Sequence, residues 1–180
     1  MILGFDPSLT SSGFCYTDQE GNIHTGRIKA NDLRQITRLQ FIRDSFIELL
    51  KVGLLRRNKY NLVVYEGYAM GGRAQRGRFF DMGELGGVLK LVAIERGFDI
   101  LVVPPTNLKQ FATETGNAKK PEITKAIASL WNYHVKQNDE ADAFALMKLG
   151  EAWIDRRVAR VYSEKRRSSL EKCQLFKGQK

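Results

Sequence analysis

Four acidic residues stand at the ends of otherwise apolar or helical segments. Asp6 closes the apolar run that opens the chain, and Glu66 closes the run Asn61–Glu66. Asp139 and Asp142 begin a predicted helix, and because a helix turns by about 100° per residue, their spacing places both side chains on one face. Taken singly, each has an ordinary structural explanation: a turn before proline, a strand end, or an acid that compensates the helix macrodipole.

The chemistry that suits such a cluster is metal-dependent phosphate hydrolysis. Carboxylates within ~5 Å of one another repel by roughly 1 kcal/mol per pair even in bulk water, so a cluster of them requires a cation. Oxygen ligands without Cys or His select a hard ion, here Mg²⁺, for which Mn²⁺ would substitute. Two such ions per site would activate a water, hold the scissile phosphate and neutralise the leaving oxygen. The four acids are therefore candidate metal ligands and catalytic residues of a nuclease.

The charge of the chain favours a polyanionic partner, with nucleic acid first. The 180 residues include 29 Lys and Arg against 20 Asp and Glu, for a formal net charge of +9. The segment Asp155–Lys180 holds nine of the basic and three of the acidic residues, with little apolar periodicity. We therefore expect one domain over residues 1–155 and a basic, mobile C-terminal tail over 156–180. The alternative for this segment is an ordinary solvated surface.

Composition excludes several other classes of protein. With 43% hydrophobic residues, the chain is expected to be globular rather than disordered. Its 2 cysteines, Cys15 and Cys173, are not at metal-ligand or redox spacing, which excludes a zinc ribbon and favours a reducing compartment. No apolar run is long enough to span a membrane, and the N-terminus lacks a signal-peptide pattern, so we expect a cytoplasmic protein.

The elements that must position the acidic residues form an α/β pattern. Apolar runs predict the strands Met1–Asp6, Gly13–Thr17, Ile23–Ile28, Asn61–Glu66 and Asp99–Val103. Helical periodicity and capping predict helices from Asn31 or Asp32 to about Arg56, and over Phe79–Arg96, Thr106–Phe111, Pro121–Trp131 and Asn138–Trp153. This order fits a mixed five-stranded sheet flanked by helices. If the first and fourth strands are parallel neighbours, Asp6 and Glu66 meet at one edge of the sheet.

Four segments, in order along the chain, resemble blocks of the RuvC-type Holliday junction resolvases. They are MILGFDPSLTSSGFCY (Met1–Tyr16), NLVVYE (Asn61–Glu66), VPPTNLKQFATETGNAKKPEI (Val103–Ile123) and NDEADAFALMKL (Asn138–Leu149). The resemblance implies an RNase H-like fold and a Mg²⁺-dependent homodimer that resolves four-way junctions and other branched DNA by paired incision. By motif position, it assigns the metal-binding catalytic set to Asp6, Glu66, Asp139 and Asp142.

The same resemblance assigns basic residues to the reaction and to the DNA. Lys109 and Lys120 match positions that approach the scissile region, and Lys119 or Lys120 matches a contact to the DNA backbone. A cation at such a place would stabilise the negative charge that the transition state gains. Solvated surface charge is the alternative for each of these lysines.

The sequence departs from the family pattern after Glu66. Cellular members carry an aromatic residue here that inserts at the junction centre, and in this chain Tyr68 or Met70 would take that place. DNA contacts are also expected from the basic residues of the following Gly-punctuated segment, through the DNA backbone rather than through base readout. These basic residues are Arg73, Arg76 and Arg78. Compactness and the basic C-terminal end resemble the bacteriophage members, which implies selection of DNA by structure and a bacterial or phage-infected cell.

A candidate surface for the implied homodimer is the helix predicted over Phe79–Arg96. It contains Gly83, Gly86 and Gly87, each of which costs a helix interior on the order of 1 kcal/mol relative to Ala. Glycines at that cost indicate a close approach of backbone. The approaching group is either a second subunit or the helix's own sheet.

Other functions stay open at this point. One is an RNase H-like nuclease that acts on other branched substrates or on RNA–DNA hybrids. Another is a catalytically silent junction-binding protein that shares the fold. A nucleotide hydrolase of the actin-like type is disfavoured, because it needs a second phosphate-binding domain and a longer chain.

Overall fold

Six β-strands form one mixed sheet in the computed structural model, which describes residues 1–18, 20–54, 60–68 and 76–178. The strands lie in the order β3-β2-β1-β4-β5-β6. Their bounds are β1 Ile2–Asp6, β2 Ser11–Thr17, β3 Ile23–Lys29, β4 Leu62–Glu66, β5 Asp99–Val103 and β6 Gln174–Phe176. The helices are α1 Gln35–Leu54, α2 Arg76–Glu95, α3 Pro105–Thr113, α4 Lys120–Trp131, α5 Asn138–Ile154, α6 Arg156–Arg160 and α7 Glu164–Ser168.

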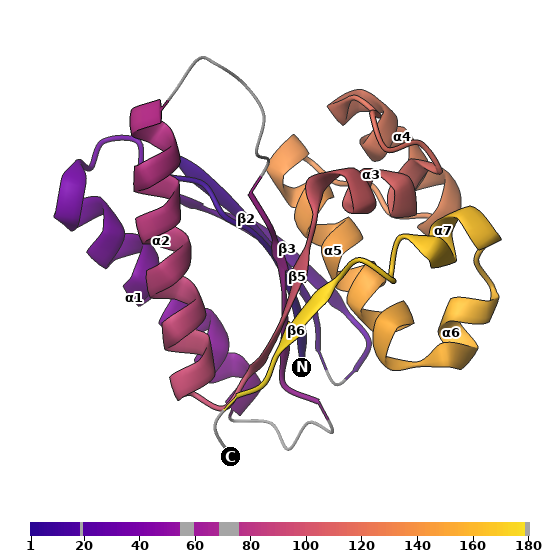
Figure 1. Ribbon diagram of the computed structural model, residues 1–180, viewed down its shortest axis with the longest axis horizontal. Coiled ribbons are helices and arrows are strands. Elements are labelled where there is room, and N and C mark those ends of the chain that lie inside the picture. The colour runs from indigo at the N-terminus through magenta and orange to yellow at the C-terminus, as the bar shows by residue number, and fades with distance from the viewer. Residues whose placement is uncertain (19, 55–59, 69–75, 179–180) are drawn as a thin grey trace.

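Two helical layers enclose the sheet (Figure 1). The helices α1 and α2 cover one face, and α3 to α7 lie on the other. Because side chains alternate between faces along a strand, Leu3 and Phe5 of β1 join a core that includes Phe46 of α1 and Leu89 of α2. The opposite core is built around α5, whose Phe144 is buried. The strands that carry the candidate acidic residues are therefore packed against a hydrophobic core on both faces of the sheet.

The parallel central strands bring their carboxyl ends to one edge of the sheet. β1 pairs with β4 in parallel, with Phe5 opposite Tyr65, and β4 pairs with β5 in the same sense. Asp6 and Glu66 come next on each strand and so end neighbouring strands, as the sequence predicts. By the same alternation both lie on the face covered by α5, whereas Tyr65 lies on the α1 and α2 face.

Two glycines allow α5 to lie directly on the backbone of the sheet. A Cβ added at Gly4 of β1 would collide with the carbonyl oxygen of Ala143, and one at Gly13 of β2 would collide with that of Asp139. A larger residue at either position would force the helix away from the sheet. The close contact sets the first turns of α5 beside Asp6.

The C-terminal residues as far as 178 are folded, in contrast to the mobile tail expected over 156–180. α6 packs on α5, α7 packs on α3, and β6 pairs antiparallel with β5, with Leu175 opposite Leu101. Within the described residues, the sheet therefore has six strands instead of the five expected. β6 covers an edge of β5 that would otherwise expose unpaired backbone groups, and Leu170 and Leu175 pack against the core. These apolar residues are few and widely spaced among polar and charged ones, which is why the sequence shows no periodicity there.

The first long helix begins later than expected. The predicted cap at Asn31 or Asp32 belongs to a turn over residues 30–33, and α1 begins at Gln35. Its predicted end near Arg56 lies outside the described residues. The other predicted strands and helices coincide with observed ones to within a few residues at each end.

Two expectations about the chain as a whole can be compared with the structure. In the described ranges, no helix combines the length and apolarity that crossing a membrane requires. Cys15 and Cys173 are both free thiols.

Candidate active site

Asp6 and Glu66 lie side by side at the carboxyl ends of β1 and β4, close enough to share a hydrogen bond. Asp6 is only 9% exposed. Burial, followed by the charge of Glu66, holds the pKa of Asp6 well above its usual range. Burial also raises the pKa of Glu66. The loop after Asp6 is fixed by Ser12, whose hydroxyl donates to the Ser8 carbonyl oxygen (2.8 Å) and accepts from the Ser8 N–H (2.9 Å).

The first turns of α5 bring two further carboxylates to this edge of the sheet. Asp142 is 7% exposed, and burial together with the charge of Glu66 raises its pKa to about 7. Asp139 is more open, and its Oδ2 accepts a hydrogen bond from the Ser11 hydroxyl at 2.9 Å. The structure thus gathers all four predicted acids at the end of the parallel strands.

Lys120 places an ammonium group among these acids. It is the first residue of α4, where Pro121 follows at a position suited to a helix start. Its Nζ lies 3.4 Å from Asp139 Oδ1 and 3.8 Å from Asp142 Oδ2. Partial burial lowers the pKa of Lys120, but the nearby carboxylates, led by Asp142, raise it by more. The lysine therefore stays charged and offsets part of the negative charge of the site.

The other two predicted lysines differ in their relation to the acids. Burial raises the pKa of Glu66 and of Asp142, and the positive charge of Lys109 on α3 opposes that rise in both. Lys109 is therefore part of the electrostatic surroundings of the site. Lys119 is the exposed N-cap of α4, where its N–H donates to the Glu122 carboxylate.

The donor set suits a hard divalent cation. All four acids offer carboxylate oxygens, and burial raises the pKa values of Asp6, Glu66 and Asp142, with the charge of Glu66 adding to the rise for Asp6 and Asp142. As the side chains stand, no group of three or more His, Cys, Asp or Glu residues within the described ranges is arranged to hold a metal ion. The carboxylates lie around Lys120 instead, so an ion must displace that ammonium group or bind beside it.

Tyr68, a candidate for the residue that inserts into a junction, has its hydroxyl buried under α2. A Cβ added at Gly86 would collide with this hydroxyl, so the glycine makes room for the tyrosine. Lys90 Nζ lies 5.4 Å from the centre of the Tyr68 ring. The close approach expected at Gly86 is therefore made by a side chain of the same chain.

The remaining predicted DNA contacts lie at the edge of the described structure or beyond it. Met70 and Arg73 lie outside the described residues. Arg76 and Arg78 lie in the first turn of α2, and only their backbone is described.

Ser11 belongs to the site but is not among the residues predicted from the sequence. Its position at the start of β2 and its polar side chain are the only signals that the sequence carries for its bond to Asp139.

Glu140, which follows Asp139 in the sequence, is buried but faces β3. There it lies 3.8 Å from Arg27 Nε and accepts from the Thr25 hydroxyl at 3.3 Å. Glu140 is therefore a structural acid.

This architecture defines the class of the protein. A mixed sheet with acids at the ends of its central parallel strands, covered by a helix that carries two more, is the RNase H-like arrangement. The sequence model of the family described as crossover junction endodeoxyribonuclease RuvC matches residues 2–148. The chain belongs to this family, whose members are metal-dependent nucleases.

Individual relatives agree with this assignment. The crossover junction endodeoxyribonuclease RuvC of Halothermothrix orenii is 26% identical over 153 residues, which cover 81% of this chain and 88% of the relative. The Thermus thermophilus RuvC structure has a TM-score of 0.63 at 20% identity and covers 85% of this chain and 95% of that one. The structure of T. thermophilus RuvC in complex with a Holliday junction substrate gives a TM-score of 0.65 at 19% identity, with 85% and 94% covered.

Proposed function

We propose that this protein resolves four-way DNA junctions, and cuts other branched DNA, by paired hydrolysis of phosphodiester bonds. The observation that carries the proposal is the convergence of Asp6, Glu66 and Asp142, from three separate elements, beside Lys120. Family membership supports the reaction, and the T. thermophilus relative has been seen with a Holliday junction substrate. We infer that the protein acts in the cytoplasm of a bacterial or phage-infected cell, as the family assignment suggests.

The acids are assigned as metal ligands on the basis of their donor chemistry. Asp6, Glu66, Asp139 and Asp142 would hold Mg²⁺, or Mn²⁺ in its place. When bound, two such ions supply an activated water and positive charge at the scissile phosphate. The protein contributes a preformed, largely buried carboxylate edge, in which the Ser11 hydroxyl keeps Asp139 turned towards the site.

Two lysines are assigned the role of stabilising the transition state. Lys109 and Lys120 approach the carboxylates from α3 and α4, on the same side of the sheet. The reacting phosphate gains negative charge in the transition state, and ammonium groups already in place stabilise it without reorganisation. Phosphate contacts from Lys119, Arg73, Arg76 and Arg78 would make junction binding weaken steeply with salt.

We assign the role of inserting at the junction centre to Tyr68 or Met70. Tyr68 can insert only after its hydroxyl leaves the position under Gly86.

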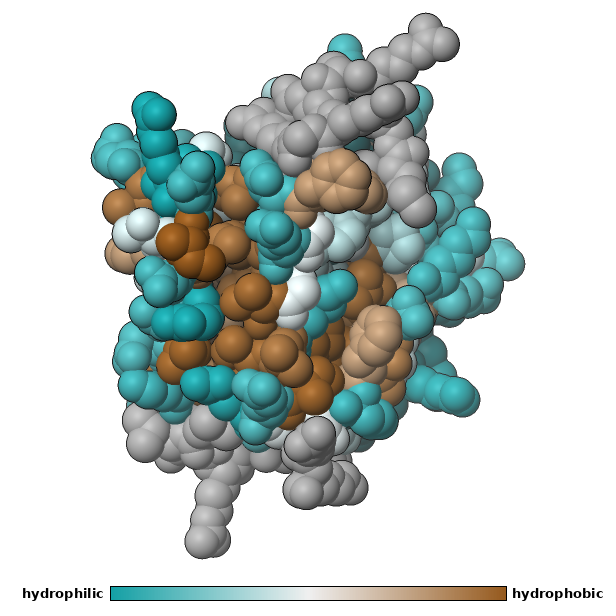
Figure 2. Space-filling view, turned by 60° about the vertical axis from the view of Figure 1, so that its left-hand side comes forward, coloured by the Kyte–Doolittle hydropathy of each residue, from teal (hydrophilic) through white to brown (hydrophobic). Residues whose placement is uncertain are grey.

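The exposed face of α2 suits a dimer interface. Phe80 and Leu91 are 69% and 59% exposed, and Gly83 and Gly87 lie on the same helical face with no atom within 4 Å of an added Cβ. Figure 2 shows apolar side chains gathered on the side of the molecule that α1 and α2 form. A twofold dimer built on this face would present two sites to a twofold junction, which allows paired incision.

A single cleavage experiment tests the proposal. The protein is incubated with a fluorescent four-way junction and Mg²⁺, in parallel with a fork, a flap, a linear duplex and an RNA–DNA hybrid at one salt concentration. We expect symmetric paired nicks in the junction and little product from the linear duplex. Preferred cutting of the hybrid would favour the RNase H-like alternative, and binding without product at every metal concentration would favour the catalytically silent one.

Isosteric variants identify the residues responsible. Asp6→Asn and Asp142→Asn are expected to abolish cleavage and to leave junction binding nearly intact, because each removes a charge from the site without changing its shape. Asp32→Asn makes the same chemical change in an exposed turn and serves as the control. Equal loss of binding and cutting in the two site variants would contradict the assignment.

A further inference from the structure

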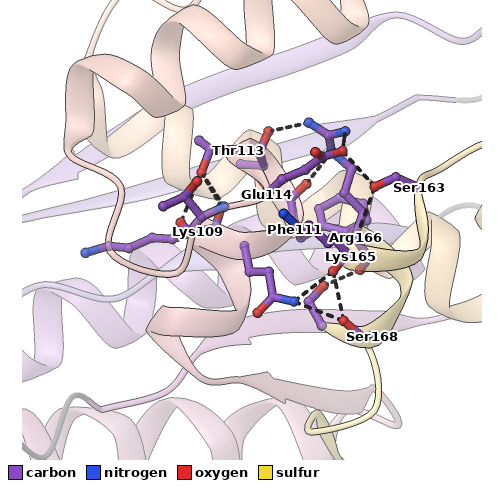
Figure 3. A network of polar contacts seen from close by, with 12 residues as sticks. Lys109, Phe111, Thr113, Glu114, Ser163, Lys165, Arg166 and Ser168 are labelled. Carbon is purple, nitrogen blue, oxygen red and sulfur yellow. Dashed lines mark hydrogen bonds and ion pairs between the residues drawn. The ribbon is translucent and has the colours of Figure 1, made fainter.

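The C-terminal segment, residues 163–169, is hydrogen bonded along one side of α3 (Figure 3). The amide of Asn107 donates to the Ser169 carbonyl oxygen at 2.7 Å. One turn further on, the amide of Gln110 donates to the Lys165 carbonyl oxygen at 2.8 Å and to the Ser168 hydroxyl at 3.0 Å. The helix that carries Lys109 is thus bound to residues that lie beyond the family match of 2–148.

Arg166 completes this contact at the C-terminal end of α3. Its side chain is 14% exposed, and its Nε donates to the Phe111 carbonyl oxygen at 3.0 Å and its Nη2 to that of Ala112 at 3.4 Å. It also forms an ion pair with Glu114, whose carboxylate accepts from the Ser163 hydroxyl at 2.7 Å. The last carbonyl groups of a helix lack partners within it and carry partial negative charge. A guanidinium group suits that position because it is planar, charged and rich in donors.

The contact and Lys109 lie on opposite sides of the helix. Asn107, Gln110, Phe111 and Glu114 follow the spacing of one helical face, and at about 100° per residue Lys109 lies roughly 200° from Asn107. In Figure 3 the Lys109 side chain points away from Arg166 and Ser163. A movement of α3 away from α7 would therefore move Lys109 relative to the carboxylates.

We propose that Arg166 is a positioning residue, which holds α3 against the C-terminal segment so that Lys109 stays in place at the acidic site. This inference rests on the proposed function, because it assigns the segment a role in the same reaction. At its other end α3 follows β5 directly, and its N-cap, Pro104, makes no side-chain capping bond. The helix also packs on α4 and α5, and the bonds from Arg166 at its C-terminal end add to this packing in setting its position across the site.

A double-mutant cycle on single-turnover cleavage tests the proposal. The variants are Arg166→Ala, Lys109→Ala and the pair, assayed with protein in excess over a four-way junction. Arg166→Ala is expected to lower the cleavage rate by about tenfold or more, since small displacements of reacting groups are costly, and to leave the junction Kd in metal-free buffer unchanged. In the Lys109→Ala background the same change should cost nothing further. Arg166→Lys should recover part of the rate.

Arg167→Ala is the matched control. Arg167 is the exposed neighbour of Arg166 on α7, so its removal takes away the same charge without the contact to α3. We expect it to leave rate and Kd unchanged. Equal losses from Arg166→Ala with and without Lys109 would overturn the proposal, as would a weaker Kd for Arg166→Ala or Arg167→Ala, which would assign the segment to DNA binding instead.

Failure of the proposed function gives a different result. A wild-type protein that cuts no branched DNA refutes that function without any variant. The stabilisation of α3 by Arg166 can then be tested separately by amide hydrogen exchange. The C-terminal turn of α3 should exchange at least several-fold faster in Arg166→Ala than in Arg167→Ala, and equal exchange in the two would overturn it.

Discussion

Asp142 is expected to destabilise the metal-free protein at neutral and alkaline pH. Burial and the charge of Glu66 raise its pKa from 3.8 to about 7. When folding raises the pKa of an acid, that acid contributes to the free energy of unfolding through its protonated form. This contribution is complete below the pKa of the unfolded state and is lost as the pH rises through the pKa of the folded state. At ~1.36 kcal/mol for each tenfold change, the charged carboxylate costs at most roughly 4 kcal/mol of unfolding free energy above pH 7.

Asp142→Asn removes this charge and keeps the shape of the side chain. In urea unfolding with EDTA at about pH 8, the variant is expected to be more stable than the wild type by about 1–4 kcal/mol. The difference should shrink towards pH 4, where the wild-type carboxyl is already protonated. Mg²⁺ should stabilise the wild type more than the variant, because the variant has lost a ligand. The exposed Asp32→Asn change should shift stability by less than ~0.5 kcal/mol at either pH.

Two results would refute this reasoning. One is an Asp142→Asn variant that is less stable than the wild type at pH 8 without metal. The other is a stability difference that does not change between pH 8 and pH 4. Either would mean that the surroundings of Asp142 favour its charged form, and the site would then have no electrostatic need for a cation.

Three further predictions test the fold, the interface and the site. Gly4→Val drives a branched side chain into the Ala143 carbonyl and should lower the unfolding free energy by about 2–3 kcal/mol, measured by urea unfolding. Leu91→Glu places a charge on the exposed face of α2, and sedimentation should show a monomer where the wild type is a dimer; a dimeric variant would refute that interface. Lys120→Ala should slow single-turnover cleavage by about 100-fold with little change in junction affinity, whereas the exposed Lys125→Ala on the same helix should not.

The sequence predicts the central elements well because their signals are local. β1 and β4 are short apolar runs that end at Asp6 and Glu66, and β5 is a short apolar run that ends at Val103, just before Pro104. Asp139 and Asp142 have a spacing that fixes their common face as soon as the helix is assumed. The meeting of strands and helix at one edge then follows from parallel pairing.

The features that the sequence did not predict depend on tertiary contacts. β6 has only three residues and gains its place from the open edge of β5. In the sequence, Arg166 is one of several basic residues in a charged segment, and only the fold shows that it contacts α3. The burial of the Tyr68 hydroxyl depends on the absence of a side chain at Gly86, which lies one helix further along the chain. None of these contacts has a periodic pattern in sequence.

The central claim is that the acids from β1, β4 and α5 bind a divalent cation used to cut branched DNA. The most direct measurement is anomalous scattering from crystals of the protein soaked in Mn²⁺. We predict a strong peak bounded by carboxylate oxygens of Asp6, Glu66 and Asp142, and its disappearance in Asp142→Asn crystals. A protein that cleaves four-way junctions in Mn²⁺ but shows no ion at these side chains would contradict the claim.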